Sequence, residues 1–269
     1  MDHLSSSQIN LYLQCALKYK FQYIDQFPKP FRPSALVFGS AVHSALAWFH
    51  EEKMKGNQIT LEALYRIFDA DWFSQKIGEP LRFKEGEQEM ALVNLGKEFL
   101  TMYAKEELPE IKGAEIHFSI PLVDTITGED FKIDLEGFFD LVEGEGTIVE
   151  FKTSAQTLSA SDIDNRLQLT AYCYAYEILN HKPPAGLKVV NFVKARKPKM
   201  VVTETKRGKG DYQGFFYIVR EVLNGIKGGF FPPRMGFWCK DCEYAAICPL
   251  WKHTVGVKTK ESQSAVEAY

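Results

Sequence analysis

Apolar side chains recur at helical spacing in four segments of the first 110 residues, which predicts a helical N-terminal half. The first segment begins with a capping box, because Ser5 precedes Gln8 by three positions. It ends before the prolines at positions 28 and 30, which cannot continue a helix. The predicted helices span residues 4–24, 34–54, 60–77 and 86–107.

The pattern then changes to short apolar runs separated by turn residues, which predicts strands. The tightest predicted turn is Gly144-Glu145-Gly146, which joins two of these runs. The predicted strands span residues 114–123, 131–142, 147–153, 187–194 and 199–205, and two further helices are predicted over 161–180 and 212–227.

These elements predict one α/β domain over residues 1–252, in which helices flank a mixed central sheet. Its expected parts are a helical lobe at about 4–110, a core at about 111–227, and a cysteine-bearing segment at 228–252 that joins the two chain ends. Residues 253–269 are polar with few apolar positions, which predicts a flexible tail.

Composition places the chain among globular proteins. Its 269 residues are 45% hydrophobic and 25% charged, which excludes a disordered or fibrous chain. No apolar run approaches the roughly 20 residues that cross a bilayer, and the N-terminus lacks the basic and apolar regions of a signal peptide. We therefore expect a cytoplasmic protein with no membrane partner.

The net charge of −3 excludes a strongly basic coat, although a balanced total can hide a local patch. One basic stretch runs from Lys188 to Lys209 and contains a single acid, Glu204. It is either a DNA-contacting surface or a solvated hairpin with no binding role. The candidate DNA contacts are Lys194, Arg196, Lys197 and Lys199.

Asp140, Glu150 and Lys152 lie on two predicted strands joined by a short turn. Glu150 and Lys152 are two positions apart and share a face, and the antiparallel neighbour can bring Asp140 beside them. Carboxylates can hold Mg²⁺, which activates water and stabilises phosphoryl charge, and a lysine can orient or deprotonate that water. The alternative is an exposed Glu–Lys pair, but the apolar flanks of Glu150 argue against it because buried charges need partners or metals.

Two other candidate sets are less specific. Gln168 and Tyr172 are four residues apart on the helix predicted over 161–180, so they share one helical face. They either support a site or belong to a buried helix with its other tyrosines. His43 lies on an apolar helix, where a lone histidine is more often structural than a metal ligand.

Three of the five cysteines form the pattern Cys-x2-Cys-x5-Cys near the C-terminus, whereas Cys15 and Cys173 are isolated. In a cytosolic chain, metal binding or catalysis is favoured over disulfides. Cys173 lies in a predicted buried helix and is interpreted as a small apolar core residue.

Taken in order along nearly the whole chain, these motifs resemble those of RecB-like nucleases in the PD-(D/E)XK superfamily. Within that group the chain is similar to the iron–sulfur nucleases, namely the nuclease domain of the AddB helicase-nuclease subunit and the CRISPR-adaptation exonucleases. Cys15-Ala16 stands where the family usually has Cys-Pro. The matching elements are Leu4-Ser5-Ser6-Ser7 with Cys15, Gly39-x-x-x-His43, Gly137-x-x-Asp140, Glu150-x-Lys152, Gln168-x-x-x-Tyr172 and Cys239-x2-Cys242-x5-Cys248-Pro249.

The resemblance implies a restriction-endonuclease-like fold and DNA hydrolysis that depends on Mg²⁺ or Mn²⁺. It implies that Lys152 positions or deprotonates the attacking water, and that Gln168 and Tyr172 support the site and the DNA. Glu115 matches an auxiliary acid only loosely. The implied metal ligands are His43, Asp140, Glu150 and the backbone carbonyl of Phe151.

The resemblance also implies that Cys15, Cys239, Cys242 and Cys248 hold one [4Fe–4S] cluster, with zinc as the less favoured occupant. Zinc sites more often pair two Cys-x2-Cys units, whereas Cys15 stands alone. Such a cluster would staple the first helix to the C-terminal segment. No other sequence feature indicates how the two chain ends are held together.

We therefore expect a metal-dependent deoxyribonuclease, preferentially an exonuclease, in DNA repair and recombination or in CRISPR or phage DNA processing. Its substrate would be single-stranded DNA or duplex ends. No Gly-x4-Gly-Lys-Ser/Thr motif occurs, so unwinding would come from a helicase or CRISPR-adaptation partner. The alternative is a non-catalytic DNA-binding module with a structural metal cluster, but the complete Asp140, Glu150 and Lys152 set favours the enzyme.

Overall fold

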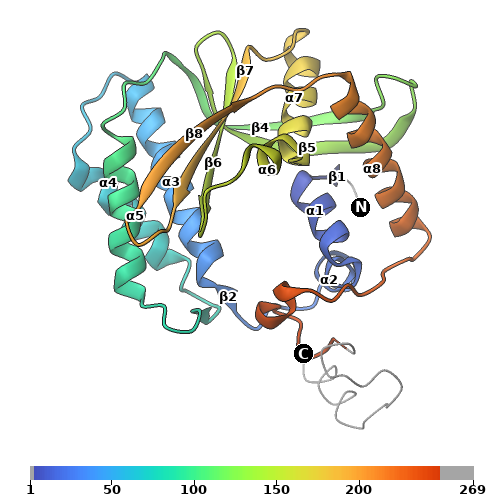
Figure 1. The fold of residues 1–269 in the computed structure, drawn as a ribbon, viewed down its shortest axis with the longest axis horizontal. Helices are drawn as coiled ribbons and strands as arrows, with labels where there is room; N and C mark the ends of the chain where they lie inside the picture. Colours follow the sequence, from blue (N-terminus) through green and yellow to red (C-terminus); the bar gives the residue numbers. More distant parts are fainter. Residues whose placement is uncertain (1–2, 249–269) are drawn as a thin grey trace.

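The computed structural model describes residues 3–248, and a mixed β-sheet with helices on both faces forms its centre (Figure 1). This arrangement confirms the predicted fold class. No helix in the described part of the chain has both the length and the apolar character needed to cross a membrane. The helices are α1 (Ser6–Gln14), α2 (Ala16–Tyr19), α3 (Ser34–Met54), α4 (Leu61–Ser74), α5 (Glu89–Tyr103), α6 (Ala160–Asp164), α7 (Leu167–Asn180) and α8 (Lys209–Lys227), with a π-helical turn at Lys20–Ile24 and a 3₁₀ turn at Phe237–Asp241.

The main sheet follows the order β1-β5-β6-β7-β8, with β4 paired to β5 as well. The pairs β1–β5 and β6–β7 are parallel, whereas β4–β5, β5–β6 and β7–β8 are antiparallel. A separate two-stranded sheet joins β2 and β3. The strands are β1 (His3–Leu4), β2 (Arg32–Pro33), β3 (Leu81–Arg82), β4 (Ile111–Val123), β5 (Asp130–Glu143), β6 (Thr147–Ser154), β7 (Gly186–Val193) and β8 (Lys199–Thr205).

Two different strands share one edge of β5. Because β4 pairs with β5 along nearly its full length, β1 and β6 must both lie on the opposite edge. On that edge β1 pairs with Asp134 and Leu135, and β6 pairs with Leu141 to Glu143. Within the described residues, the stretch 136–140 between them has no strand partner on this edge, so the sheet opens there.

Each face of the sheet carries its own hydrophobic core. The first core includes Phe139 with side chains of α1, α7 and α8. The second includes Val149 and Phe151 with side chains of α3, α4 and α5. Since residues alternate along a strand, the burial of Val149 and Phe151 in the second core directs Glu150 and Lys152 toward the opposite face, where α7 lies.

The single helix predicted over 4–24 is wrong, because the chain leaves helical conformation at Cys15, where φ is −162° and ψ is 102°. The helix predicted over 161–180 is likewise divided into α6 and α7. Neither interruption contains Gly or Pro, so the sequence lacked a local signal for it. The short strands β1, β2 and β3 were also missed, since two residues show no periodicity.

Direct contacts hold the two chain ends together, which the sequence did not indicate. The buried carboxylate of Glu243 pairs with Lys18 Nζ at 2.5 Å. The Tyr12 hydroxyl donates to a C-terminal carbonyl, that of Phe230, and the Tyr244 hydroxyl donates to the carbonyl of Phe27 at 3.1 Å. Contacts other than the cysteines therefore join the chain ends, although no feature of the sequence indicated them. The predicted tail over 253–269 lies outside the described residues.

Candidate active site

Three side chains with metal-ligand chemistry converge at the opening of the sheet. His43 comes from α3, Glu115 from β4 and Asp140 from β5, and a ligand atom of each lies within 4.8 Å of the others. His43 Nδ1 is 3.5 Å from Asp140 Oδ2. Glu115 and Asp140 lie between the pairs Ala114–Leu141 and Ile116–Phe139 of the β4–β5 ladder, so they are at the same level of the sheet. Glu115 has a positive φ of 47°, an uncommon conformation that is concentrated at functional sites.

A backbone hydrogen bond fixes Asp140 at this opening. The N–H of Phe151 on β6 donates to Asp140 Oδ2 at 2.8 Å. The Asp140 carboxylate thus accepts a hydrogen bond from a backbone N–H that would otherwise bond to a neighbouring strand. The N–H and C=O of one strand residue point to the same edge, so the Phe151 carbonyl faces the opening as well.

Glu150, Lys152, Gln168 and Tyr172 form a continuous polar chain from β6 to α7. The Glu150 side chain, 1% exposed, forms an ion pair with Lys152 Nζ. Lys152 Nζ donates to Gln168 Oε1 at 2.9 Å, and Gln168 Nε2 donates to the Tyr172 hydroxyl at 2.8 Å. Of the two residues that the sequence placed on one helical face, Gln168 therefore contacts the lysine and Tyr172 contacts Gln168.

Burial dominates the electrostatics of the acidic residues. It raises the pKa of Glu150 to about 7, with a further contribution from Asp140, although Lys152 opposes the shift. Burial also raises the pKa of Glu115, again helped by Asp140. Burial alone would raise the pKa of Asp140 too. The hydrogen bond with His43 and the charges of His43 and Lys152 outweigh burial and hold this pKa below its ordinary value. Asp140 is thus the most readily ionised acid of the group.

These features fit a divalent cation. Glu150 Oε2 is buried without a hydrogen-bond partner among the described residues, and the charge of Asp140 raises the pKa of both Glu115 and Glu150. Hard oxygen ligands with one imidazole suit Mg²⁺ or Mn²⁺. The residues positioned to hold the ion are His43, Glu115 and Asp140. Glu150 is not brought into that group, since it pairs with Lys152 instead.

The two motif glycines, Gly39 and Gly137, differ in how closely other side chains approach them. A Cβ at Gly137 would lie 2.6 Å from the ring of Phe118, so β5 can pass over this ring only with glycine at that position. A Cβ at Gly39 would meet the Thr153 hydroxyl at 3.5 Å, an ordinary contact. Close packing therefore requires Gly137 but does not require Gly39.

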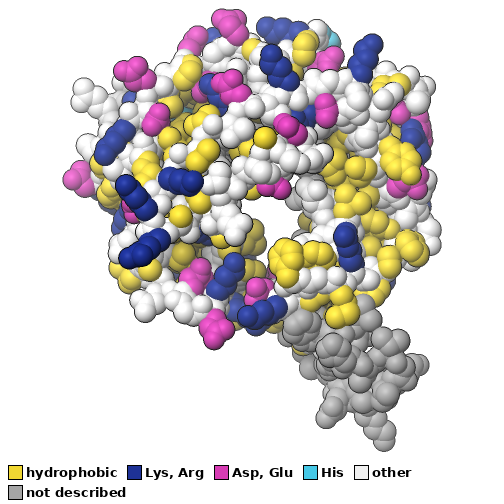
Figure 2. Space-filling view, viewed as in Figure 1, with side chains coloured by type: hydrophobic (Ala, Val, Ile, Leu, Met, Phe, Trp, Pro, Cys, Tyr) yellow, Lys and Arg dark blue, Asp and Glu magenta, His cyan; other side chains and the backbone are white. Residues whose placement is uncertain are grey.

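Two pockets meet at Asp140. One is lined by residues of α3 together with Glu115 and Lys152, and the other by residues 5–7, Phe138 and Tyr172. Figure 2 shows a hollow near the centre of the molecule, between the half that carries α3 and the half that carries α1 in Figure 1. A substrate can therefore approach Asp140 from two sides.

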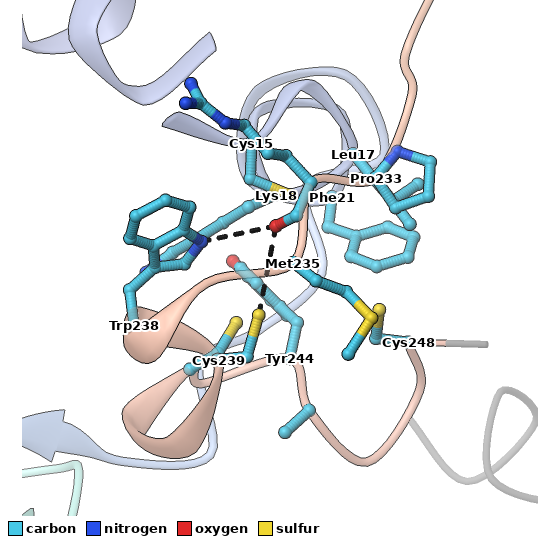
Figure 3. A pocket seen from close by; sticks show the side chains of 13 residues that line it. Cys15, Leu17, Lys18, Phe21, Pro233, Met235, Trp238, Cys239, Tyr244 and Cys248 are labelled. Carbon is cyan, nitrogen blue, oxygen red and sulfur yellow. Dashed lines mark hydrogen bonds between the residues drawn. The ribbon is translucent and has the colours of Figure 1, made fainter. Parts of the chain in front are cut away.

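Cys15, Cys239, Cys242 and Cys248 line one pocket between the chain ends (Figure 3). Burial raises the pKa of the Cys242 thiol. Four thiols around one pocket are a donor set that fits an iron–sulfur cluster or zinc. The fifth cysteine, Cys173, is buried in the first core away from this pocket.

The basic stretch from Lys188 to Lys209 divides into internal and exposed parts. Lys188 pairs with Glu143, and Arg207 donates to Thr170 Oγ1 at 3.0 Å, so both act within the fold. Lys194 lies over the ring of Phe38, 4.2 Å from its centroid, and burial lowers its pKa. The exposed cations of the β7–β8 turn are Arg196, Lys197 and Lys199. This turn lies beside the C-terminal end of β6, because the backbone N–H of residue 194 donates to the backbone carbonyl of residue 154.

Comparison with known proteins adds to this geometry. A family model described as "PD-(D/E)XK nuclease superfamily" matches residues 3–249. A crystal structure described as a "putative exonuclease" from Eubacterium rectale aligns with a TM-score of 0.56 and 14% identity, covering 99% of this chain and 93% of that chain. The crystal structure of SSO0001 aligns with a TM-score of 0.36 and 16% identity, covering 87% and 94%. No curated protein matches the chain.

Proposed function

Because this chain belongs to the PD-(D/E)XK nuclease superfamily, we propose that it is a deoxyribonuclease that depends on Mg²⁺ or Mn²⁺ and degrades DNA from its ends. The observation that carries the proposal is the convergence of His43, Glu115 and Asp140 beside Lys152 at the opening of the sheet. The description of the Eubacterium rectale structure as a "putative exonuclease" supports attack from DNA ends.

The residues divide into ligands and water-positioning groups. His43, Glu115 and Asp140 would hold the cation. We propose as further ligands Glu150, which pairs with Lys152 outside this group, and the carbonyl of Phe151, whose N–H donates to Asp140. When bound, the cation lowers the pKa of water and takes up charge on the phosphoryl oxygens. Lys152 orients the attacking water, and in its neutral form would accept its proton.

Hydrolysis then proceeds by in-line displacement at phosphorus. The water oxygen forms the new P–O bond, the bond to the leaving sugar oxygen breaks, and that oxygen takes up a proton. Gln168 keeps Lys152 in place, and Tyr172 keeps Gln168 in place. Burial, with the charges of Glu150 and Asp140, raises the pKa of Tyr172 well above its ordinary value, so its hydroxyl remains a neutral hydrogen-bonding group.

We also propose that the four-cysteine pocket holds a structural [4Fe–4S] cluster. Three of its cysteines form Cys-x2-Cys-x5-Cys and the fourth, Cys15, stands alone, whereas zinc sites more often pair two Cys-x2-Cys units. This donor pattern favours a cluster over zinc.

In the cell, we propose a role in DNA repair and recombination or in CRISPR or phage DNA processing, in the cytoplasm. The sequence contains no P-loop motif for ATP hydrolysis. Duplex opening would therefore be supplied by a helicase or by a CRISPR-adaptation partner.

The decisive experiment uses end-labelled linear DNA, single-stranded and double-stranded, beside closed single-stranded circles. With Mg²⁺ or Mn²⁺ we expect progressive shortening of linear strands, protection of the circles, and no products in EDTA. Lys152→Ala should abolish digestion in a protein that still folds. Cleavage of the circles would overturn the exonuclease proposal, and equal digestion in EDTA would overturn metal dependence. DNA binding without any hydrolysis would support the binding-module alternative.

A further inference from the structure

We propose that Phe138 is a stacking platform for an unpaired base at the active site, so that the strand reaching Asp140 is single-stranded DNA. The inference deepens the proposed nuclease function and rests on it. Phe138 lies two residues before Asp140 on β5 and is 47% exposed, whereas the following Phe139 is 2% exposed. The exposed part of this ring, beside the candidate metal ligands, is available to a partner outside the described fold.

The Phe138 ring lies two residues along β5 from Asp140, one of the candidate metal ligands. His117 on β4 pairs with Phe138 on β5, two positions along their strands from Glu115 and Asp140. The His117 and Phe138 rings lie 4.9 Å apart between centroids. Two residues along a strand span about 7 Å, which is a distance that a nucleotide beside the scissile phosphate can bridge.

The surroundings of Phe138 suit a nucleotide. It lines the pocket that contains Asp140, and the hydroxyls of residues 5–7 and the amide of Gln168 form the polar part of the lining. The pocket contains one other carboxylate, Glu136, which would repel a phosphate. That carboxylate accepts from His117 Nε2 at 2.8 Å and faces His3 Nδ1 at 3.1 Å, so its charge is partly offset.

Stacking on Phe138 selects for an unpaired strand. A base within a duplex is paired and stacked on its neighbours, and must be extruded before it can reach a protein ring. A base in a single strand can stack on an aromatic side chain without that cost, and such stacking tolerates any sequence. The structure therefore favours single strands without a base preference.

The test measures coupling between Phe138 and one base. In a Lys152→Ala background, which prevents digestion, 2-aminopurine is placed at each terminal position of a single-stranded oligonucleotide in turn. We expect fluorescence quenching at one position, lost in Phe138→Ala and retained in Phe138→Trp. The matched control is Phe73→Ala, because Phe73 is 67% exposed on α4 and lies outside both pockets.

An abasic residue at the quenched position should weaken binding by about 5- to 150-fold in the Phe138 protein. The same abasic residue should have little effect in Phe138→Ala, because the stack is already missing. Equal losses in both proteins, or equal quenching in both, would overturn the proposal. Failure of the active enzyme to hydrolyse DNA would overturn the proposed nuclease function alone, since the binding measurements decide the role of Phe138 independently.

Discussion

Lys152 Nζ donates to Gln168 Oε1 at 2.9 Å, and this bond joins the candidate catalytic strand β6 to helix α7. Without it, the ammonium would be positioned by Glu150 alone, in an ion pair that is buried against the sheet. Gln168 is therefore a positioning residue, which acts on the reaction through Lys152.

Gln168→Ala should lower kcat by about 10- to 100-fold and leave KM nearly unchanged, because orientation of the lysine is lost while the DNA surface remains. Gln168→Glu retains an acceptor for Lys152 and should restore part of kcat. Steady-state kinetics on labelled single strands would measure both values. A rise in KM with unchanged kcat would instead indicate that Gln168 contacts DNA.

The two motif glycines should respond differently to alanine. Gly137→Ala should destabilise the protein by about 1–3 kcal/mol, because the new methyl group would overlap the ring of Phe118. Gly39→Ala should be neutral or stabilising by about 0.5–1 kcal/mol, since it removes a glycine from the interior of α3. Urea unfolding of both variants gives the comparison. Equal losses would show that α3 packs more tightly on β6 than the 3.5 Å contact indicates.

Loss of a cluster cysteine should loosen both chain ends. Protein purified without air should be brown, and Cys15→Ala should abolish the colour and lower the melting temperature, because ligation is coupled to folding. The ends should not separate fully, since Lys18 and Glu243 still pair. Cys173→Ala is the control, and it should keep the colour because Cys173 lies in the first core.

Metal analysis of the anaerobic protein distinguishes two claims, that the site holds an iron–sulfur cluster and that its ligation staples the chain ends together. Stoichiometric zinc without iron would refute the iron–sulfur assignment but would leave stapling intact. Stapling itself would be refuted by a Cys15→Ala variant that melts like the parent protein.

The exposed cations of the β7–β8 turn should contribute to DNA binding through phosphates. Reversing the charge of Arg196, Lys197 and Lys199 should weaken binding, and each lost phosphate contact should reduce the salt slope by about 1. Lys182→Glu is the control, since Lys182 is exposed elsewhere, after α7. Titrations at several salt concentrations measure the slope. An unchanged slope in the triple variant would identify the turn as a solvated hairpin.

His50 should make the protein sensitive to acid. It is fully buried, its Nε2 lies 2.9 Å from the Tyr103 hydroxyl, and burial lowers its pKa from 6.5 to about 4. The unfolded chain therefore binds a proton at higher pH than the folded protein. The contribution of His50 is present above pH 6.5 and is lost as pH falls toward 4, by up to about 3 kcal/mol.

His50→Leu should flatten this decline, whatever its effect on stability at pH 7. The measurement is the free energy of unfolding at pH 7 and at pH 4.5, compared with the parent protein. His181→Asn is the control, because His181 is an exposed residue that ends α7 in a left-handed conformation. An unchanged pH dependence in His50→Leu would mean that other groups cause the acid sensitivity.

Local patterns were sufficient for much of the fold. The alternation around Glu150 and the turn at residues 144–146 predicted the β5–β6 hairpin. The capping box at Ser5 and Gln8 is present at the start of α1, with both of its hydrogen bonds. These predictions are correct because each depends on residues that are close together in the chain. Burial and hydrogen bonding between such neighbours produce a regular spacing of residue types in the sequence.

The interruption at Cys15 and the central place of Glu115 could not be predicted in the same way. The apolar spacing continues across Cys15, because α1 packs against α7 and α8, and Tyr19 of α2 is buried against Phe231. Glu115 is an ordinary acid in a strand until Asp140 lies opposite it and His43 approaches from α3.

The order of the motifs, the family resemblance and the strands that carry Asp140, Glu150 and Lys152 could all be predicted from the amino-acid sequence. The place where the sheet opens depends on tertiary packing, because β1 and β6 share one edge of β5 although more than 100 residues separate them. That pairing leaves residues 136–140 without a strand partner on this edge and exposes Phe138 beside Asp140. Contacts between such distant segments depend on how whole elements pack, so they leave no periodic trace in the amino-acid sequence.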